Sequence, residues 1–309
     1  MITKVVFAAN AGAAEGSGHL KRCVEFAACL DLLKYSPTIY GNCDLQWLKE
    51  LALEKSIEIT TNTDFPEDRI LIIDSYNKSF ISEVNQKIDS NKVIQIADPY
   101  TPLLQDSRII WFDPGEFPFE LGQRVIASGP RYFPVTRIKS VNVKPEVARN
   151  VLISVGGSKQ SEVLNRLIES IERYLFPESI FHILGENEFG SSFKNKYVFY
   201  PVGNSISHLI SICDTAITAS GVSTWDFLSN GLILGFFKFV INQDSNFSFL
   251  ERNELGLPIS RDGFSFDERM IQVLITDSSW RSKSVPKLHG LFDFEWQSRF
   301  NELVDSVSK

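Results

Sequence analysis

Short apolar runs alternate with amphipathic, helix-like stretches along most of the chain. The runs hold four to six residues, are rich in Val, Ile and Phe, and are typical of strands. They are Lys4–Ala9, Ile70–Asp74, Lys92–Ala97, Arg108–Phe112, Asn150–Val155, Ile180–Leu184, Thr215–Thr218 and Leu232–Phe237. Strands that alternate with helices in this way predict βαβ units and parallel sheets.

Several of these runs are apolar at consecutive positions instead of at every second one. Strands show this pattern when helices cover both faces of their sheet. The sequence therefore predicts an α/β fold class with doubly wound, Rossmann-like domains. The apolar spacing in Leu164–Ile171 predicts a helix that faces a core. His182, inside a predicted strand, is expected to be a structural histidine with satisfied hydrogen bonds.

The polar segment Pro130–Asn150 has no sustained period and separates two halves that begin alike. In each half a strand leads to a glycine turn, which is Gly16-Ser17-Gly18 in the first half and Gly156-Gly157-Ser158 in the second. We predict domains at residues 1–140 and 148–309, with a final helix in Phe292–Val307 that packs back on the first domain. Because ligands bind at the carboxyl ends of parallel strands, we expect the ligand cleft between the domains.

Charge and cysteine content narrow the class of partner. The net charge is -7 and no dense Lys/Arg run occurs, which argues against a nucleic-acid partner. The four cysteines form no CxxC pair and have no His in ligand spacing, so we expect reduced thiols and no metal or other cofactor. No signal peptide and no apolar run long enough to cross a bilayer are evident, which predicts a cytoplasmic protein without a transmembrane segment.

The first candidate site is the turn between the first strand and its helix. Gly16 and Gly18 allow the backbone to approach a ligand closely. His19 falls at the helix start, where the positive end of the helix dipole favours a neutral imidazole, as a general base requires. Arg22 follows one turn later, within reach of an anion. An ordinary strand-to-helix turn with a surface histidine is the alternative.

The second candidate site is a turn of small residues after the strand at Thr215–Thr218. Backbone N–H groups and hydroxyls there are suited to a diphosphate, and the residues are Ser220, Gly221, Ser223 and Thr224. Asp226, further into the helix, is placed to accept ribose hydroxyls. Gly156, Gly157 and Ser158 form a similar turn. A plain Ser/Thr helix cap explains either turn equally well when it is taken alone.

Polar residues at other strand ends form a third group. Asp74 and Tyr76 follow the buried run Ile70–Ile73, and Asp98 follows the next strand. Side chains at these edges serve ligands more often than packing, although an aspartate that caps the next turn is the alternative. The stretch Val240–Asp244, which contains Asn242 and Gln243, is expected to end another strand, and one of its amides is expected to reach a sugar.

These motifs, in this order, resemble the nucleotide-sugar hydrolases of pseudaminic acid biosynthesis. Gly16–Cys23 is similar to that family's GxGHxxRC motif, and Ile72–Tyr76 to its Ile-Asp-x-Tyr. Further similarities are Gly129–Tyr132 with Gly-x-x-Tyr, Gly156–Ser158 with Gly-Gly-(Ser/Thr)-Asp, Ala219–Asp226 with the serine-rich helix start, and Asn242-Gln243 with an Asn-Gln pair. The family has the two-domain GT-B fold and is related to the glycosyltransferase that makes lipid II.

The resemblance implies a metal-independent hydrolase that removes UDP from a UDP-linked 2,4-diacetamido-trideoxy sugar, in surface glycan or nonulosonic acid biosynthesis. His19 would activate water at the anomeric carbon, Tyr76 would support it, and Asn242 would lie near the sugar. The turns of the second domain would hold the diphosphate.

Departures from the family pattern leave the sugar and the acceptor open. Lys159 stands where the family usually has Asp, and Asp226 replaces the usual Glu. Asp98-Pro99-Tyr100 replaces a pair of adjacent aspartates. Two alternatives to hydrolysis follow: a GT-B glycosyltransferase that moves the sugar to a hydroxyl of a glycan, lipid or small metabolite, and an inactive protein that only binds a nucleotide sugar.

Overall fold

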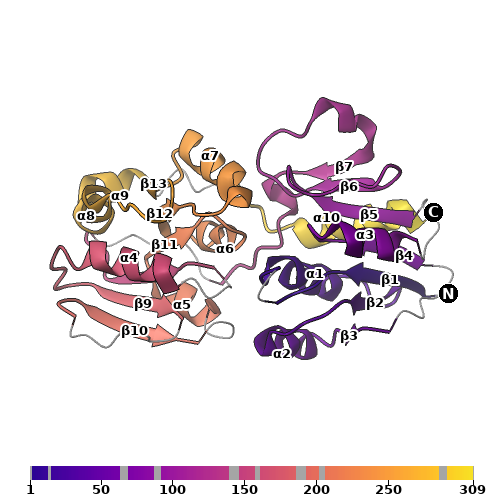
Figure 1. The fold of residues 1–309 in the computed structure, drawn as a ribbon, viewed down its shortest axis with the longest axis horizontal. Helices are drawn as coiled ribbons and strands as arrows, with labels where there is room; N and C mark the ends of the chain where they lie inside the picture. Colours follow the sequence, from indigo (N-terminus) through magenta and orange to yellow (C-terminus); the bar gives the residue numbers. More distant parts are fainter. Residues whose placement is uncertain are drawn as a thin grey trace. The chain divides into compact units, whose positions relative to one another are not determined.

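The computed structural model describes residues 2–12, 15–62, 69–86, 92–138, 146–156, 161–185, 193–201, 206–284 and 291–308. The chain divides into two compact units. Unit 1 contains Met1–Pro134 and Asp293–Lys309, and unit 2 contains Val135–Phe292. The division places the last stretch of the chain in the same unit as its first strand (Figure 1).

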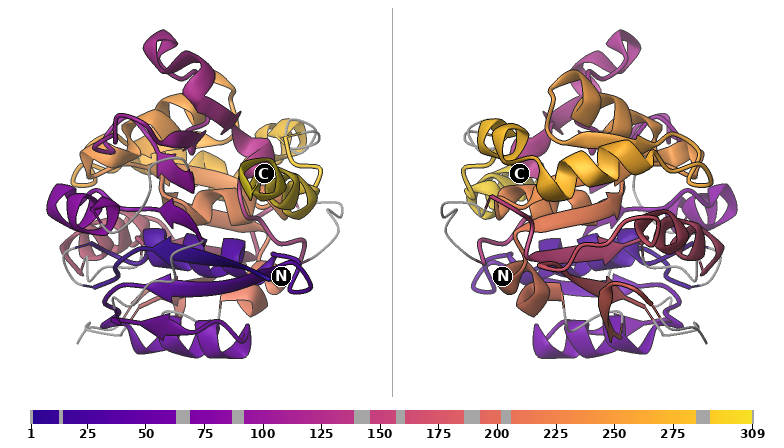
Figure 2. Two further views of the ribbon diagram at one scale, coloured as in Figure 1. Left: turned by 90° about the vertical axis from the view of Figure 1, so that its right-hand side faces the viewer. Right: turned by 90° about the vertical axis from the view of Figure 1, so that its left-hand side faces the viewer.

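Unit 1 is built on a parallel sheet with the strand order β3-β2-β1-β4-β5-β6-β7. Its strands are β1 (Thr3–Ala8), β2 (Tyr35–Tyr40), β3 (Ile59–Thr60), β4 (Arg69–Ile73), β5 (Val93–Ala97), β6 (Arg108–Trp111) and β7 (Val125–Ser128). Its helices are α1 (Gly18–Ala28), α2 (Gln46–Glu54), α3 (Lys78–Asn85) and α10 (Trp296–Ser308), with 3-10 turns η2 (Phe119–Arg124) and η3 (Pro130–Tyr132). The left view of Figure 2 shows this unit in front.

Helices cover both faces of the first sheet, as the consecutive apolar positions predict. On one face Val6 and Leu71 pack with Ile81 and Val84 of α3. On the other face Phe7 packs against Phe300 of α10, with ring centroids 6.4 Å apart. Adjacent residues of a strand point to opposite faces, so Val6 and Phe7 belong to two separate layers of core.

Helix α10 is held on unit 1 by aromatic stacking and by hydrogen bonds from one asparagine. The Phe300 ring stacks on Phe26 of α1 with centroids 4.3 Å apart. Asn301 accepts from the backbone N–H of Asp31 at 2.9 Å and donates to the carbonyl of Cys29 at 2.8 Å. These hydrogen bonds tie the helix to the turn that follows α1.

Unit 2 has a second parallel sheet with the order β10-β9-β8-β11-β12-β13. The strands are β8 (Asn150–Ser154), β9 (Ile180–Leu184), β10 (Lys196–Tyr200), β11 (Thr215–Ala219), β12 (Ile233–Phe237) and β13 (Leu257–Ser260). Around them lie α4 (Ser161–Ile171), α5 (Ile206–Ile212), α6 (Ser223–Ser229), η4 (Ile241–Gln243), α7 (Asp244–Arg252), α8 (Glu268–Thr276) and α9 (Ser278–Ser284). The right view of Figure 2 has this unit in front.

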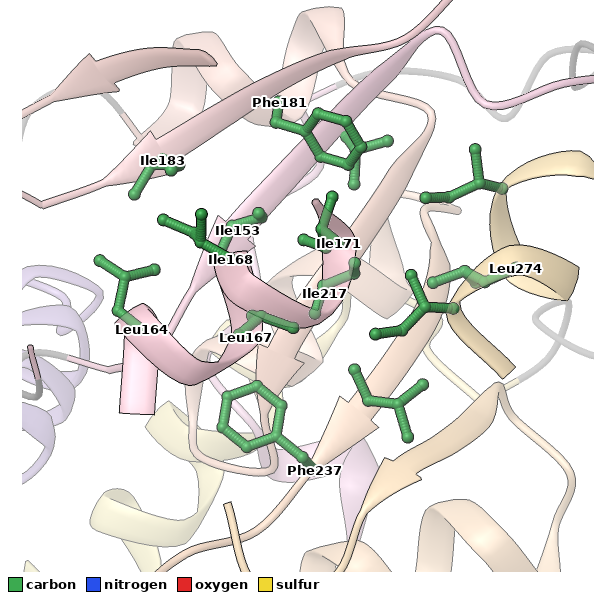
Figure 3. Close-up of a cluster of buried hydrophobic side chains, with 14 of the residues drawn as sticks. Ile153, Leu164, Leu167, Ile168, Ile171, Phe181, Ile183, Ile217, Phe237 and Leu274 are labelled. Carbon is green, nitrogen blue, oxygen red and sulfur yellow. The ribbon is translucent and has the colours of Figure 1, made fainter. Parts of the chain in front are cut away.

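A cluster of buried hydrophobic side chains in unit 2 lies between its sheet and helices α4 and α8 (Figure 3). Helix α4 supplies the face that its spacing predicts, through Leu164, Leu167, Ile168 and Ile171. Strand residues such as Ile153 and Ile217 and the α8 residue Leu274 complete it. His182 has the predicted structural role, because its two ring nitrogens lie 3.0 Å from Asn150 Oδ1 and 3.1 Å from Tyr200 Oη.

The predicted fold class is confirmed: the chain forms two Rossmann-like α/β units. All eight predicted strands are present, with ends that differ by a residue at most. The sequence did not reveal β2, β3, β7, β10 and β13. Prolines interrupt β2 and β13, at Pro37 and Pro258, while β10 is partly exposed and lies at an edge of its sheet.

Phe300→Ala tests how strongly α10 contributes to unit 1. The ring is 1% exposed, so its loss leaves a cavity between α10, α1 and β1 and is expected to destabilise unit 1 by about 3–5 kcal/mol. Urea denaturation followed by circular dichroism measures the change. Glu302→Ala, at an exposed position of the same helix, is the control. Equal stability of the two variants would show that α10 is dispensable.

Candidate functional site

Each sheet has one point at which the strand order reverses. In unit 1 this point lies between β1 and β4, and in unit 2 between β8 and β11. Ligands of open α/β sheets bind at the carboxyl ends of the strands on either side of such a point. The loop from β1 to α1 and the residues that follow β4 meet this description in unit 1.

The loop after β1 is fixed by main-chain hydrogen bonds. The N–H groups of Gly12 and Gly16 donate to each other's carbonyl oxygens at 3.1 and 2.8 Å. Gly16 has a φ of 74°, a conformation that side chains with a Cβ seldom adopt. The loop is also bound to the one after β2, because Ala11 N–H donates to Asn42 at 2.8 Å and Asp44 N–H donates to Ala11 at 3.0 Å. Helix α1 therefore begins at a defined place, with Gly18 as its first residue.

Three of the predicted site residues form one buried cluster in unit 1. Asp74 comes directly after β4 and is 1% exposed, and it receives hydrogen bonds from two residues of α1. Arg22 donates from Nε to Asp74 Oδ2 and from a terminal nitrogen to Asp74 Oδ1, both at 2.6 Å. His19 Nδ1 lies 2.6 Å from the same Oδ1. His19 and Arg22 thus meet Asp74 although they precede it by 55 and 52 positions in the sequence.

The hydrogen bond to Asp74 determines which ring nitrogen of His19 carries a proton. Burial raises the pKa of Asp74, but the interactions with Arg22 and the hydrogen bond from His19 lower it by more, so its net pKa is below the ordinary 3.8. An ionised carboxylate accepts and does not donate, so His19 Nδ1 is the donor. In a neutral imidazole, Nε2 is then the acceptor. Among the described residues Nε2 makes no hydrogen bond, which leaves it available to a ligand.

Tyr76 packs against His19 and is held by Asp98. The two rings meet edge to face, with centroids 4.4 Å apart and an interplanar angle of 88°. The Tyr76 hydroxyl donates to Asp98, which also accepts from the N–H of Tyr100 at 2.9 Å. Burial and then the charge of Asp98 raise the pKa of the Tyr76 hydroxyl, so this phenol stays protonated near neutral pH. Its oxygen presents lone pairs, and no proton, to a ligand.

Phe112 completes the cluster and was not identified from the sequence. The Arg22 guanidinium lies over its ring, 4.0 Å from the centroid. Burial lowers the pKa of Arg22, while Asp74 raises it by more, so the cation is retained at any physiological pH. A phenylalanine at the end of an apolar strand is indistinguishable in sequence from a core residue, so no signal marked it.

In unit 2 the residues after β11 adopt a tight turn. The hydroxyl of Ser220 donates to the carbonyl of Phe237 at 2.9 Å, and that of Thr224 to Ala219 at 3.0 Å. Both side chains are fully buried, so their hydroxyls hold the turn itself. The backbone N–H groups of Gly221 and Thr224, which we expected to be free for a diphosphate, instead donate within the turn, to Ala219 at 2.7 Å and to Gly221 at 3.2 Å. Gly221 and Ser223 are partly exposed, as is Asp226 in the seven-residue helix α6.

The other predicted residues of unit 2 lie at the same sheet edge. Gly156 follows β8, is exposed and has a φ of 102°. Gly157, Ser158 and Lys159 lie outside the described residues. The prediction that Val240–Asp244 ends a strand is wrong, because β12 stops at Phe237 and Ile241–Gln243 form the 3-10 turn η4. Asn242 is exposed there, whereas Gln243 is buried and accepts from the Phe239 N–H at 3.0 Å. Gln243 therefore shapes the turn after β12.

Two classes of site are not found in the described part of the chain. No cluster of His, Cys, Asp or Glu there is able to hold a metal ion. None of the helices described is both long and apolar enough for a membrane span.

Comparison with known proteins identifies the architecture. No family model matches the sequence, and no curated protein matches it either. Solved structures do match along the whole chain. MurG of Acinetobacter baumannii has a TM-score of 0.63 at 11% identity and covers 98% of this chain and 99% of its own. This protein has the GT-B fold.

Two further solved structures match this chain about as well, and they are named for different activities. CalG4, the calicheamicin glycosyltransferase, has a TM-score of 0.60 at 10% identity and covers 99% of this chain and 98% of its own. A putative UDP-N-acetylglucosamine 2-epimerase from Listeria monocytogenes has a TM-score of 0.60 at 10% identity and covers 99% and 96%. At such low sequence identities the structural similarity establishes the GT-B fold alone. The reaction has to be inferred from the residues of the site.

The low pKa of Asp74 makes a specific prediction for acid stability. A carboxyl whose pKa is lowered by folding contributes stability above its unfolded value of 3.8, and this contribution is lost as pH falls through the lowered value. Asp74→Asn removes this contribution and leaves Arg22 buried without its anion. The free energy of unfolding near pH 7 is therefore expected to fall by about 3–5 kcal/mol. The difference from the parent should shrink below pH 3.8.

Urea denaturation from pH 7 to pH 2.5 measures this dependence. Asp106→Asn, at an exposed position of unit 1, is the matched control and should follow the parent throughout. A gap between Asp74→Asn and the parent that stays constant down to pH 2.5 would contradict the assignment of Asp74 as an ionised partner.

Proposed function

We propose that the protein is a nucleotide-sugar-dependent glycosyltransferase with His19 as its general base. The observation that carries the proposal is the contact of His19 Nδ1 with the ionised Asp74, 2.6 Å apart, which leaves Nε2 as an acceptor at the strand-order reversal of the first sheet. A histidine oriented in this way by a carboxylate is suited to remove a proton from a hydroxyl.

The proposed reaction is a displacement at the anomeric carbon of the sugar. Nε2 takes the proton of the acceptor hydroxyl while the acceptor oxygen bonds to the anomeric carbon. The bond from this carbon to the diphosphate oxygen breaks, and the nucleoside diphosphate leaves with the electron pair. Tyr76, whose proton is committed to Asp98, is placed to accept a hydrogen bond from a donor group of the sugar or the acceptor.

We assign the nucleotide diphosphate to the strand-order reversal of unit 2. Gly156, Gly221 and Ser223 lie there at the carboxyl ends of β8 and β11; Gly156 is exposed, and Gly221 and Ser223 are partly exposed. Asp226 is proposed for the ribose and Asn242 for the sugar. The names of two structural neighbours support a sugar nucleotide as donor, since CalG4 is a glycosyltransferase and the putative epimerase names UDP-N-acetylglucosamine in its activity.

Hydrolysis, with water in place of the acceptor hydroxyl, is the second candidate. The sequence Gly16–Cys23 favours it, because its resemblance is to hydrolases of UDP-linked sugars. The neighbours named as glycosyltransferases favour transfer. His19 has the same chemical task in both reactions, since water and an alcohol each lose one proton as the new bond forms.

Release of nucleoside diphosphate tests the proposal and separates the two candidates. The protein is incubated with a panel of UDP-, GDP- and dTDP-sugars, first alone and then with sugar, lipid and small-molecule alcohols. Release that depends on an alcohol indicates transfer, and equal release in buffer indicates hydrolysis. No release from any donor, despite measurable nucleotide binding, would favour an inactive binding protein.

His19→Asn is expected to reduce turnover by about 10²- to 10⁴-fold, which is the typical contribution of a general base. Nucleotide binding, measured by calorimetry, should stay within a few-fold of the parent because His19 is not assigned to the diphosphate. His208→Asn, at an exposed position of unit 2, is the control. Unchanged turnover of His19→Asn would refute the role of His19.

A further inference from the structure

The guanidinium of Arg22 is part of the buried cluster and not a free cation at a surface. The residue is 6% exposed, and two of its nitrogens donate to the two oxygens of Asp74. Its Cζ lies over the ring of Phe112, 4.0 Å from the centroid. Two parallel hydrogen bonds to one carboxylate fix the guanidinium in position, which makes it a poor candidate to reach out for an anionic ligand.

Arg22 is also a close neighbour of His19. One of its terminal nitrogens lies 3.3 Å from His19 Nδ1, and both nitrogens are directed at Asp74 Oδ1. Because His19 Nδ1 and Arg22 are both donors, this short separation reflects a shared acceptor. The negative charge of Asp74 is thus divided between an arginine and a histidine.

This sharing matters because a buried carboxylate that meets only a histidine stabilises the imidazolium form. An imidazolium has protons on both nitrogens and is unable to act as a base. A permanent cation on the same carboxylate removes most of this attraction. Among the described residues, the other charged or titratable groups near the pair are Tyr76, Asp98 and Cys23. Tyr76 is protonated near neutral pH and donates to Asp98, and burial raises the pKa of the Cys23 thiol so that it is neutral.

We propose that Arg22 is a positioning residue that neutralises Asp74, so that Asp74 orients His19 and fixes its tautomer without drawing a proton onto Nε2. With His19 neutral, the buried group of Arg22, Asp74 and His19 carries no net charge. The use of His19 as a base rests on the function proposed above. The protonation state of the two His19 ring nitrogens is independent of that function, and it is measured without any substrate.

Nitrogen NMR of the histidine side chains at pH 7 tests this role directly. The chain has only four histidines, so replacing each in turn assigns its signals. In the parent, Nδ1 of His19 should be protonated and Nε2 unprotonated. In Arg22→Met, which keeps an apolar stem over Phe112, most molecules should have both nitrogens protonated. A parent with Nε2 already protonated at pH 7 would overturn the proposal, as would Arg22→Met with Nε2 unprotonated.

Two further variants separate charge from structure. Arg22→Lys retains a cation and should restore the unprotonated Nε2. The double variant Arg22→Met with Asp74→Asn carries neither buried charge and should also have a neutral His19. If Arg22→Met alone does not fold, a folded double variant still supports the proposal. The single and double variants differ only in the charge of Asp74, so this unpaired charge would be the cause of the unfolding. A double variant as unfolded as the single one would contradict it.

The pH dependence of turnover gives a readout that a purely structural role would not change. Arg22→Met should lose at least about tenfold in kcat at pH 7, and the loss should become smaller at pH 9, where an imidazolium gives up its proton. A loss that is the same at both pH values would refute the electrostatic role. Absence of turnover in the parent would refute the proposed function. The NMR experiment would still test the role of Arg22, because it needs no substrate.

Discussion

The ion pair between Arg22 and Asp74 is the constraint around which the candidate site is organised. A carboxylate at 1% exposure is stable as an anion only if charges and hydrogen bonds replace its water, and α1 supplies both. The described residues on either side of this contact show how α1 is placed. Gly16 in its left-handed conformation and the hydrogen bonds to the loop after β2 determine where α1 begins, and thereby where Arg22 and His19 meet Asp74.

The two sheets present different kinds of residue at the edge where their strand order reverses. In each, the glycine turns and polar residues gather at the carboxyl ends of the two strands where the order reverses. The first sheet places a histidine, a tyrosine and buried charges at this edge, whereas the second places small residues and main-chain groups there. The first set is suited to proton transfer and the second to close approach of a phosphorylated ligand, in accordance with the roles that we assign.

Much of the architecture was predictable because consecutive apolar positions indicate strands covered on both faces, and these gave eight strands and the α/β class. Strands interrupted by Pro37 or Pro258 carry too little of that signal. For the site, the sequence indicated that His19, Arg22 and Asp74 matter, but not that they touch. A contact across 55 positions depends on which strands are neighbours, and the reversal between β1 and β4 has no local signature. The buried hydroxyls of Ser220 and Thr224 depend in the same way on their tertiary neighbours.

The return of α10 to unit 1 has a consequence for biosynthesis. The segment that forms unit 2 is inserted between two parts of unit 1, and the ribosome completes it before Phe300 exists. Domains generally fold as units during synthesis. Unit 2 is therefore able to reach its final structure while the first sheet still exposes the apolar face around Phe7, which Phe300 later covers. The core of unit 1, although most of it is made first, is completed only after the segment of unit 2 has been made.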